Sequence, residues 1–368
     1  MSAPDVAVVG GGIVGCALAA LLAEGGATVR LYEREAIAAA ASGRNSGVLQ
    51  HPLDEPLVPV HEASLELYRT LGHGFELPAE PAGVLVLSED RAALEAGCEI
   101  AARFPELAPE WLEGAALEAA EPELGPGLFA YRQATGRTVP PAAAARAWAQ
   151  RAREAGAELR VGTAVEALDR SGGRAAGVVA GGRSEPAGAV VVAAGPWTPE
   201  LVAPDGSWRP IAASWGVNVE VRLAQPPRHV LEQAGVEEIA SASGGGIESI
   251  FSIVTAEGVS AVGSTFLAEQ PDAPAAAPRL LERGTRYLPA LGRVNAFSAR
   301  ACPRPQSRDG RPLLGPVEGI DGLHVASGNG PWGISLGPGS AQLVAGALLG
   351  GGEPIAPELA ARRFGAPA

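Results

Sequence analysis

The sequence predicts an α/β fold that combines a βαβ unit with a region of antiparallel sheet. Three observations carry this prediction. An apolar run meets a glycine-rich turn at Val6–Gly15, a helix pattern precedes an apolar strand at Arg146–Leu168, and stretches between residues 213 and 267 alternate apolar and polar residues. Strands that alternate with helices indicate a parallel sheet, whereas a period of two indicates half-buried antiparallel strands.

The N-terminal unit has the features of a dinucleotide-binding turn. A strand-like run, Val6–Val9, leads into a turn with the G-x-G-x-x-G spacing, and the helix pattern Ile13–Glu24 follows it. The glycines are expected to allow a tight turn, the approach of a diphosphate and close helix–strand packing, at Gly10, Gly12 and Gly15 in that order. The helix N-terminus then offers free N–H groups and a partial positive charge to the diphosphate.

The next strand, which ends at Glu33, supports this interpretation. Glu33 lies about 20 residues past the turn, where a carboxylate accepts hydrogen bonds from a ribose diol. Because a carboxylate there disfavours a 2′-phosphate, the motif favours NAD or FAD over NADP. A second glycine triplet, in Ser241–Ile250, has Ser249 in place of the last glycine and is predicted to be a hairpin turn.

Composition excludes several classes of protein. The chain has 368 residues, of which 47% are hydrophobic, and a formal net charge of −13. The hydrophobic fraction predicts a large core, and the negative charge argues against a nucleic-acid partner or an anionic membrane surface. All 28 basic residues are arginine, so there is no lysine for a Schiff base, a pyridoxal cofactor or a Walker-type nucleotide site.

The cysteines and the apolar runs bear on cellular location. Cys16, Cys98 and Cys302 are far apart in the sequence, which predicts neither a disulfide framework nor a metal site and fits a reducing compartment. The N-terminus has no basic region followed by an apolar core, and no apolar run reaches about 20 residues. We therefore expect a cytoplasmic protein without a membrane span.

Three further stretches narrow the choice of cofactor. Ala38–His51 is rich in small and polar residues and is predicted to be a loop with exposed N–H donors. Gly188–Leu201 is an apolar strand that ends in Ala-Gly-Pro-Trp, and Gly322–Gly351 combines a strand, a glycine-rich turn and a helix.

Together these stretches resemble the FAD-dependent amine and amino-acid oxidoreductases of the D-amino-acid-oxidase superfamily, the group that includes glycine oxidase and sarcosine oxidase. The resemblance runs from Val6 to about Phe364. It rests on five landmarks in order: the first glycine turn, SGRNSG, the A-G-x-W turn, RPQSRDGRPLLGP and GNGPWGIS.

The resemblance implies FAD as the cofactor and a discontinuous Rossmann-type FAD-binding domain. This domain carries an inserted α+β substrate domain built on a mostly antiparallel sheet. The implied boundaries are 1–80, 138–209 and 297–368 for the FAD-binding domain and 81–137 and 210–296 for the substrate domain.

The glycine motif and the resemblance assign a set of residues to FAD. In this family the C-terminal turn presents a helix N-terminus to the flavin ring, where N–H groups stabilise the negative charge of reduced flavin. The alternative for that turn is a glycine-rich surface loop. The assigned residues are Gly10, Gly12, Ile13, Val14, Gly15, Glu33, Arg34, Ser42, Arg44, Asn45, Ser46, Gly47, Val165, Ala194, Gly195, Trp197, Arg304, Gly330, Gly333, Ile334 and Ser335.

Arg304 is the expected ligand of a substrate carboxylate, because it aligns with the arginine that related amino-acid oxidases use and a guanidinium binds a carboxylate bidentately. The alternative is an exposed loop arginine beside Asp309. Gln50 and His51 are expected near the flavin as substrate-binding residues, where His51 would orient the substrate or supply positive charge. Trp332 is expected in the wall of the substrate pocket. The alternatives for His51 and Trp332 are structural roles. No obligatory proton-transfer residue is expected, because a deprotonated amine can pass hydride to flavin directly.

Two departures from the family pattern concern the mechanism. Sarcosine-oxidase-like members place a lysine near the flavin to activate oxygen, and this chain has none. Both O₂ and another electron acceptor therefore stay open. Cys302 falls where sarcosine oxidases attach FAD covalently, whereas D-amino-acid and glycine oxidases commonly have glycine there, so a covalent link and a buried free cysteine are both open.

The implied reaction is oxidation of the C–N bond of a D-amino acid, glycine or an N-methyl amino acid to an imine that then hydrolyses. One alternative is oxidation of a 2-hydroxy acid, since SGRNSGVLQH is similar to a loop of L-2-hydroxyglutarate oxidases, although Gln50 stands where those have histidine. A second alternative is a flavin-bearing electron-relay subunit without its own substrate. The oligomeric state stays open.

Overall fold

A six-stranded sheet forms the centre of one lobe. The computed structural model describes residues 3–235 and 248–367. The edge strand β18 runs antiparallel to its neighbour, and the other strands run parallel to one another. In sheet order the strands are β18 (Leu313–Pro316), β19 (Leu323–Ser327), β12 (Ala189–Val192), β1 (Val6–Val9), β2 (Val29–Glu33) and β8 (Glu158–Val161).

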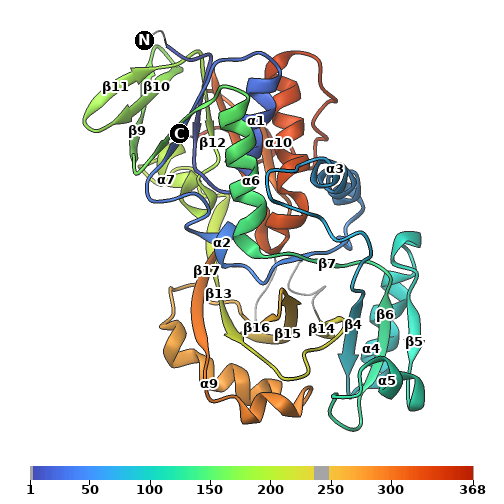
Figure 1. The fold of residues 1–368 in the computed structure, drawn as a ribbon. Helices are drawn as coiled ribbons and strands as arrows, with labels where there is room; N and C mark the ends of the chain where they lie inside the picture. Colours follow the sequence, from blue (N-terminus) through green and yellow to red (C-terminus); the bar gives the residue numbers. More distant parts are fainter. Residues whose placement is uncertain (1–2, 236–247, 368) are drawn as a thin grey trace.

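Helices cover one face of this sheet and a small antiparallel sheet covers the other (Figure 1). On β1, Val6 and Val8 join the core beneath the helices, whereas Ala7 and Val9 join the core beneath the small sheet. This alternation follows from the period of two along a strand. The helices are α1 (Ile13–Glu24), α6 (Pro141–Glu154) and α10 (Gly333–Leu349), and the small sheet comprises β9 (Val165–Ser171), β10 (Arg174–Ala180) and β11 (Arg183–Pro186).

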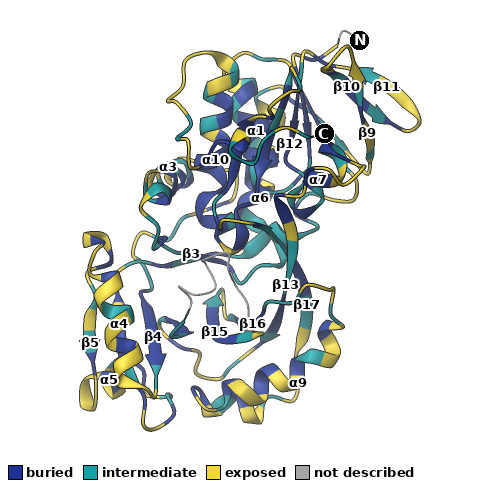
Figure 2. Ribbon diagram, turned by 180° about the vertical axis from the view of Figure 1, so that it is seen from behind, coloured by how far each residue is buried: buried dark blue, intermediate teal, exposed yellow. Residues whose placement is uncertain are grey.

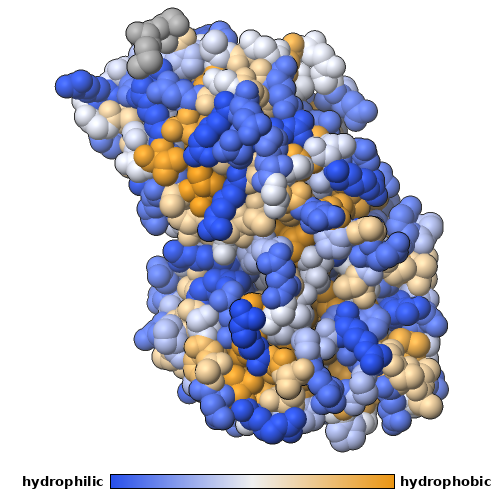
Figure 3. Space-filling view, in the orientation of Figure 1, coloured by the Kyte–Doolittle hydropathy of each residue, from blue (hydrophilic) through white to orange (hydrophobic). Residues whose placement is uncertain are grey.

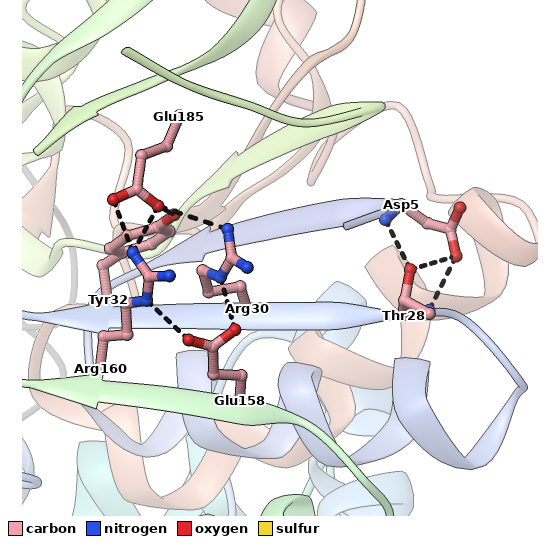
Figure 4. Close-up of polar contacts among 7 residues, drawn as sticks. All are labelled: Asp5, Thr28, Arg30, Tyr32, Glu158, Arg160 and Glu185. Carbon is pink, nitrogen blue, oxygen red and sulfur yellow. Dashed lines mark hydrogen bonds and ion pairs between the residues drawn. The ribbon is translucent and has the colours of Figure 1, made fainter. Parts of the chain in front are cut away.

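A polar network ties the small sheet to the central sheet (Figure 4). The Glu185 carboxylate on β11 accepts hydrogen bonds from Tyr32 Oη on β2 (2.6 Å) and from Arg160 Nη1 on β8 (2.5 Å). Glu158 on β8 accepts from Arg30 Nε and from Arg160 Nε, each at 2.7 Å. Burial and the Glu185 carboxylate raise the pKa of Tyr32 to about 12, so its hydroxyl remains a donor.

An eight-stranded, mostly antiparallel sheet forms the second lobe. One pair, β14 with β4, is parallel. In sheet order the strands are β17 (Ser298–Ser307), β13 (Ile211–Val221), β16 (Val259–Thr265), β15 (Ser249–Ala256), β14 (Val230–Gln233), β4 (Val84–Ser88), β6 (Phe129–Gln133) and β5 (Glu110–Leu112).

The two faces of this sheet differ in polarity. The face that packs on α9 (Ala273–Gly284) is apolar and includes Val217, Val219 and Phe251. The opposite face carries Asn218 and Ser252, which alternate with those residues along the same strands. Figure 2 shows α9 buried on its inner side and exposed on its outer side. The other α-helices and strands in the described residues are α2 (Ala41–Arg44), α3 (Val58–Arg69), α4 (Arg91–Ala101), α5 (Ala115–Ala120), α7 (Thr198–Val202), β3 (Val48–Leu49) and β7 (Arg137–Thr138).

The predicted α/β fold, with a Rossmann-type unit and a mostly antiparallel second sheet, is confirmed. The domain boundaries stay a prediction. Strand β17 lies in the range 297–368 assigned to the first domain, yet it pairs along its length with β13 of the eight-stranded sheet. The expected loop at Ala38–His51 differs from the structure, which forms the helical turn α2 and the short strand β3 there. Residues 241–247 of the predicted hairpin turn lie outside the described residues.

The surface in Figure 3 is largely hydrophilic, with small and separate hydrophobic patches. Within residues 3–235 and 248–367, no helix combines the length and the apolar character that a membrane crossing requires.

Candidate active site

A cavity of about 380 Å³ lies at the carboxyl ends of the parallel strands, facing β17 of the second sheet. We call it the large cavity. Ligands of open α/β sheets bind at this edge. Most of the residues predicted to bind the cofactor line it: Gly10, Gly12, Ile13, Val14, Glu33, Arg34, Ser42, Asn45, Val165, Ala194, Gly195, Trp197, Arg304, Gly330, Gly333 and Ile334.

The three glycines of the first turn meet different surroundings. Gly10 has φ +117°, and a Cβ there would lie 2.4 Å from the Ala193 carbonyl oxygen. A Cβ on Gly15 would lie 1.9 Å from the Gly10 carbonyl oxygen. At Gly12 the nearest atom to an added Cβ is Ser42 Oγ, at 3.1 Å. A side chain at Gly10 or Gly15 would thus clash with the backbone of the fold itself. A side chain at Gly12 would instead occupy space at the edge of the cavity.

The side chains of Glu33 and Ser42 accept hydrogen bonds from backbone N–H groups in and near the first glycine turn. Glu33 Oε2 accepts a hydrogen bond from Gly11 N (2.7 Å), and Glu33 Oε1 accepts one from Glu35 N (2.8 Å). Ser42 Oγ accepts a hydrogen bond from Ile13 N at 2.9 Å. The turn therefore holds Glu33 against the backbone, where its carboxylate can receive a ribose diol.

The outer part of the large cavity has a stacked pair. The Arg34 guanidinium lies 4.0 Å from the centroid of the Trp197 ring, a distance typical of a cation–π contact. Both side chains line the cavity with Val165 from β9.

The N-terminus of α10 lies at the inner part of the cavity, after a 3₁₀ turn at Gly330–Trp332. The first N–H groups of a helix have no partner within it. Asn329, 2% exposed, lines the cavity and carries a carbonyl oxygen, Oδ1, without a hydrogen-bond partner in the part of the chain that the structure describes. A buried acceptor without a partner costs stability, so it fits a cavity that receives a ligand with a donor group.

These features fit FAD. The glycine turn with Glu33 suits the adenosine diphosphate half, and the α10 N-terminus with Asn329 suits the flavin half. Bound there, FAD would supply the acceptor for a hydride.

A second cavity, of about 100 Å³, adjoins the large one. We call it the small cavity. Asn45, Arg304, Pro331 and Ile334 line both cavities. Several polar side chains project into the small cavity from the polar face of the eight-stranded sheet and from neighbouring loops: Ser46, Gln50, Asn218, Glu232, Ser252, Ser264 and Ser335.

Arg304 is half-buried on β17 and is held by the sheet. Its Nη1 donates to the Thr265 carbonyl oxygen (2.9 Å) and its Nη2 donates to Ser264 Oγ (2.5 Å). The guanidinium carbon lies 4.6 Å from the centroid of the Phe266 ring. Burial lowers the pKa of Arg304, because desolvation disfavours its charged form.

No carboxylate among residues 3–235 and 248–367 forms an ion pair with Arg304. Asp309, the neighbour considered in the alternative interpretation, pairs with Arg363 at 2.6 Å. Arg304 is therefore not an exposed loop arginine beside Asp309. A desolvated guanidinium at the junction of the two cavities can bind an anion such as a substrate carboxylate.

Gly216 makes room for this guanidinium. A Cβ at Gly216 would lie 2.2 Å from Arg304 Nη2 and 2.5 Å from the guanidinium carbon. Because β13 has no side chain at this position, the Arg304 head group can cross it to reach β16. Gly216 could not be predicted as a site residue, since nothing local in the sequence pairs β13 with β17.

The other residues expected at the substrate differ in their placement. Gln50 lines the small cavity, and its backbone N donates to Ser335 Oγ at 3.0 Å. Trp332 lines the small cavity and is 6% exposed. His51 is not among the described residues that line either cavity. Its ring centroid lies 5.5 Å from those of His61 and Phe104, and burial lowers its pKa.

Two residues of the 38–51 segment support its shape rather than line the cavities. The Arg44 carbonyl oxygen accepts hydrogen bonds from Asn218 Nδ2 (2.8 Å) and Arg300 Nε (3.1 Å). Gly47 has φ +86°, and a Cβ there would lie 2.2 Å from the Val139 carbonyl oxygen. These contacts fix the segment against the eight-stranded sheet and against the residues that precede α6.

Cys302 lines the large cavity, is 2% exposed, and its Sγ donates to the Ala41 carbonyl oxygen at 3.8 Å. Burial raises the pKa of its thiol, which disfavours the nucleophilic thiolate. The covalent flavin link stays a prediction.

Comparison with known proteins agrees with this geometry. The DAO family model, described as FAD dependent oxidoreductase, matches residues 5–347. A glycine oxidase from Pseudomonas aeruginosa is 29% identical over 370 residues, which cover 95% of this chain and 96% of that protein.

Two further similarities point the same way. A D-amino acid dehydrogenase from Rhizobium johnstonii is 30% identical over 221 residues, or 60% of this chain, and the match spans about half (51%) of that protein's length. The crystal structure of glycine oxidase from Bacillus cereus superimposes with a TM-score of 0.81 at 25% identity and covers 94% of this chain and 95% of that one.

Proposed function

The chain belongs to the DAO family of FAD-dependent oxidoreductases, and we propose that it oxidises the C–N bond of a small amino acid or secondary amine that carries a carboxylate. One observation carries this proposal. Arg304 places a desolvated guanidinium at the junction of the two cavities, and no described carboxylate forms an ion pair with it. Similarity to glycine oxidases over nearly the whole chain supports the same substrate class.

The small cavity favours a compact and polar substrate. Its volume is about 100 Å³, and ligand pockets for larger molecules are typically about 300 Å³ or more. Glu232, 8% exposed, and Arg304 are its ionisable lining residues among those described. An amino acid presents a carboxylate and an amine, which match a guanidinium and a carboxylate respectively.

The residues of this chain then have distinct tasks. Arg304 binds the carboxylate and so orients the α-carbon, and Glu232 accepts a hydrogen bond from the amino group. The first N–H groups of α10 stabilise the negative charge that reaches the cofactor. No side chain needs to remove a proton from a substrate whose amine is already neutral, and the imine product hydrolyses in water.

The electron acceptor and the location of the protein are part of the proposal. O₂ and another acceptor both stay open, because the chain has no lysine to activate oxygen. The cytoplasmic location stays a prediction that cell fractionation tests.

The experiment is an anaerobic titration of flavin absorbance with D- and L-amino acids, N-methyl amino acids and 2-hydroxy acids. We expect a small amino acid or N-methyl amino acid to bleach the flavin, faster as pH rises toward deprotonation of the amine. If only 2-hydroxy acids bleach the flavin, the reaction is oxidation of a 2-hydroxy acid and the proposal is wrong. If none of these compounds bleaches it, the result favours an electron-relay subunit without its own substrate. Readmitting air then separates an oxidase from a dehydrogenase.

A further inference from the structure

The first turn of α10 is held from behind by helix α3. Tyr68 Oη donates to the Ile334 carbonyl oxygen at 2.7 Å, and His61 Nδ1 lies 3.4 Å from the Ser335 carbonyl oxygen. Tyr68 is 1% exposed and His61 is 3% exposed. Figure 1 shows α3 beside α10, and the two helices are in contact.

Pro338 explains why Ile334 needs this donor. In a helix, the N–H of residue 338 would donate to the carbonyl of residue 334, and proline has no N–H. The Ile334 carbonyl therefore lacks its helical partner, and the Tyr68 hydroxyl replaces it. A buried carbonyl left without any donor would destabilise the fold.

Helix α3 can supply the donor because the helices approach closely at Gly339. A Cβ at Gly339 would lie 2.2 Å from the Val60 carbonyl oxygen. The Gly339 N–H donates to Ser64 Oγ at 2.9 Å. His61, Ser64 and Tyr68 lie three and four residues apart and so share one face of α3.

The Tyr68 hydrogen bond acts on the peptide group between two residues that line the cavities. The Ile334 carbonyl and the Ser335 N–H belong to the same peptide unit. Ile334 lines both cavities and Ser335 lines the small one. A hydrogen bond to a carbonyl polarises its peptide unit, which makes the N–H on the other side a stronger donor.

We propose that Tyr68 is a positioning residue that raises the reduction potential of the flavin by polarising the Ile334–Ser335 peptide. This inference rests on one part of the proposed function, the placement of the flavin ring at the N-terminus of α10. It does not depend on the substrate. Reduction adds negative charge to the flavin, so a stronger N–H donor stabilises the reduced form more than the oxidised form.

Tyr68 and His61 are both in the protonation state that a hydrogen-bond donor to the first turn of α10 requires. Burial raises the pKa of Tyr68 above its usual range, so its hydroxyl keeps its proton. Burial, followed by the neighbouring His51, lowers the pKa of His61 to about 4, so this imidazole is neutral at neutral pH. The support for the turn is thus provided by neutral donors.

The test is the reduction potential of the FAD-loaded Tyr68→Phe variant, measured without substrate by anaerobic equilibration with a reference dye. We expect the equilibrium to shift toward oxidised flavin by about 3- to 10-fold, the value of one neutral hydrogen bond. The matched control is Tyr287→Phe, a buried tyrosine that stacks on Phe251 in the other lobe. The control should keep the wild-type potential.

A second variant separates polarisation from simple support of the fold. In Tyr68→Phe with Pro338→Ala, a backbone N–H becomes available to the Ile334 carbonyl, and we expect the potential to return toward wild type. If Tyr68→Phe alone does not retain FAD, the reduction potential of the double variant becomes the test. A potential near the wild-type value would then support the inference. An unchanged potential in Tyr68→Phe, an equal shift in Tyr287→Phe, or no recovery in the double variant would overturn the inference. Failure to find an amine substrate would affect the proposed function alone.

Discussion

Arg304 and Gly216 show how single residues create the candidate substrate site. The guanidinium crosses β13 where Gly216 leaves space, and it is oriented by Ser264 and Thr265 on β16. Such a group is costly to bury without an anion. Its position at the junction of the two cavities supports our proposal that it binds a substrate carboxylate.

Replacing Arg304 should damage catalysis more than stability. Arg304→Met removes the bidentate partner of the carboxylate and should lower kcat/KM for a carboxylate-bearing amine by about 30-fold or more, equivalent to at least 2 kcal/mol. Arg304→Lys keeps the positive charge but loses the planar guanidinium group. Its kcat/KM should therefore lie between those of the wild type and of Arg304→Met. The matched control is Arg308→Gln, an exposed arginine on the same segment. Equal kcat/KM in all variants would contradict the assignment of Arg304.

Gly12 and Gly15 should respond differently to the same substitution. Gly15→Ala brings a Cβ to 1.9 Å from a backbone oxygen, so we expect a lower melting temperature of the FAD-free protein. Gly12→Ala meets only Ser42 Oγ, at 3.1 Å, so the FAD-free protein should melt close to wild type while FAD affinity falls. Thermal unfolding and flavin-fluorescence titration measure these effects. Wild-type FAD affinity in Gly12→Ala would count against the cavity as the FAD site.

At the scale of elements, the Glu185 network joins β11 to the central sheet (Figure 4). Burial acts to raise the pKa of Glu185, but hydrogen bonds from Tyr32 and Arg160 outweigh it and leave the pKa below its usual value. A carboxylate with a lowered pKa contributes stability above the pKa of the unfolded state, and this contribution is lost as pH falls through the folded-state pKa.

Glu185→Gln should therefore lower the free energy of unfolding at neutral pH and have little effect at an acidic pH below the folded-state pKa, which lies below the value of about 4.3 for glutamate in unfolded chains. Urea unfolding at both pH values measures the difference between wild type and variant. The control is Glu353→Gln, an exposed glutamate, which should show no such pH dependence. A difference that is the same at both pH values would show that the network acts through packing alone.

Helices and strands that are determined by residue spacing within a short stretch could be predicted from the sequence. The run Val6–Val9, the helix Ile13–Glu24 and the strand end at Glu33 appear in the structure with those bounds. Each is set by apolar spacing and glycine positions within a short stretch. The segment Ala38–His51 was not predicted correctly, because the turn of α2 depends on contacts with residues far along the chain, such as Asn218 and Arg300.

The supporting residues of the site could not be predicted, for the same reason. Tyr68 and Ile334 are 266 positions apart, and no spacing rule connects them. Pro338 lacks an N–H in any surroundings, but the side chain that replaces this donor is defined only once α3 packs on α10. The placement of His51 beside His61 and Phe104 likewise follows from packing.

At the scale of the whole molecule, the large cavity is lined from both sheets, by the βαβ turn on one side and by Cys302 and Arg304 of β17 on the other. A ligand that fills it contacts both lobes. Because a ligand that binds only the folded state raises stability with its concentration, FAD should stabilise the entire chain rather than one lobe.

FAD added to the FAD-free protein should raise the melting temperature in one cooperative transition, by an amount equivalent to about 2.7 kcal/mol at 100 times Kd. FMN, which lacks the adenosine half expected at Glu33, should stabilise much less. Acid precipitation of the loaded protein precedes this test, since FAD that stays with the pellet would support the link through Cys302. A melting temperature that FAD does not change would contradict the assignment of the cavity.

The most direct test of the account is the anaerobic rate of flavin bleaching by one amine substrate and by its analogue without the carboxylate, in wild type and in Arg304→Met. The account predicts that the wild type prefers the carboxylate-bearing amine by about 30-fold or more, and that Arg304→Met loses this preference. The same preference in both proteins, or bleaching by 2-hydroxy acids alone, would contradict it.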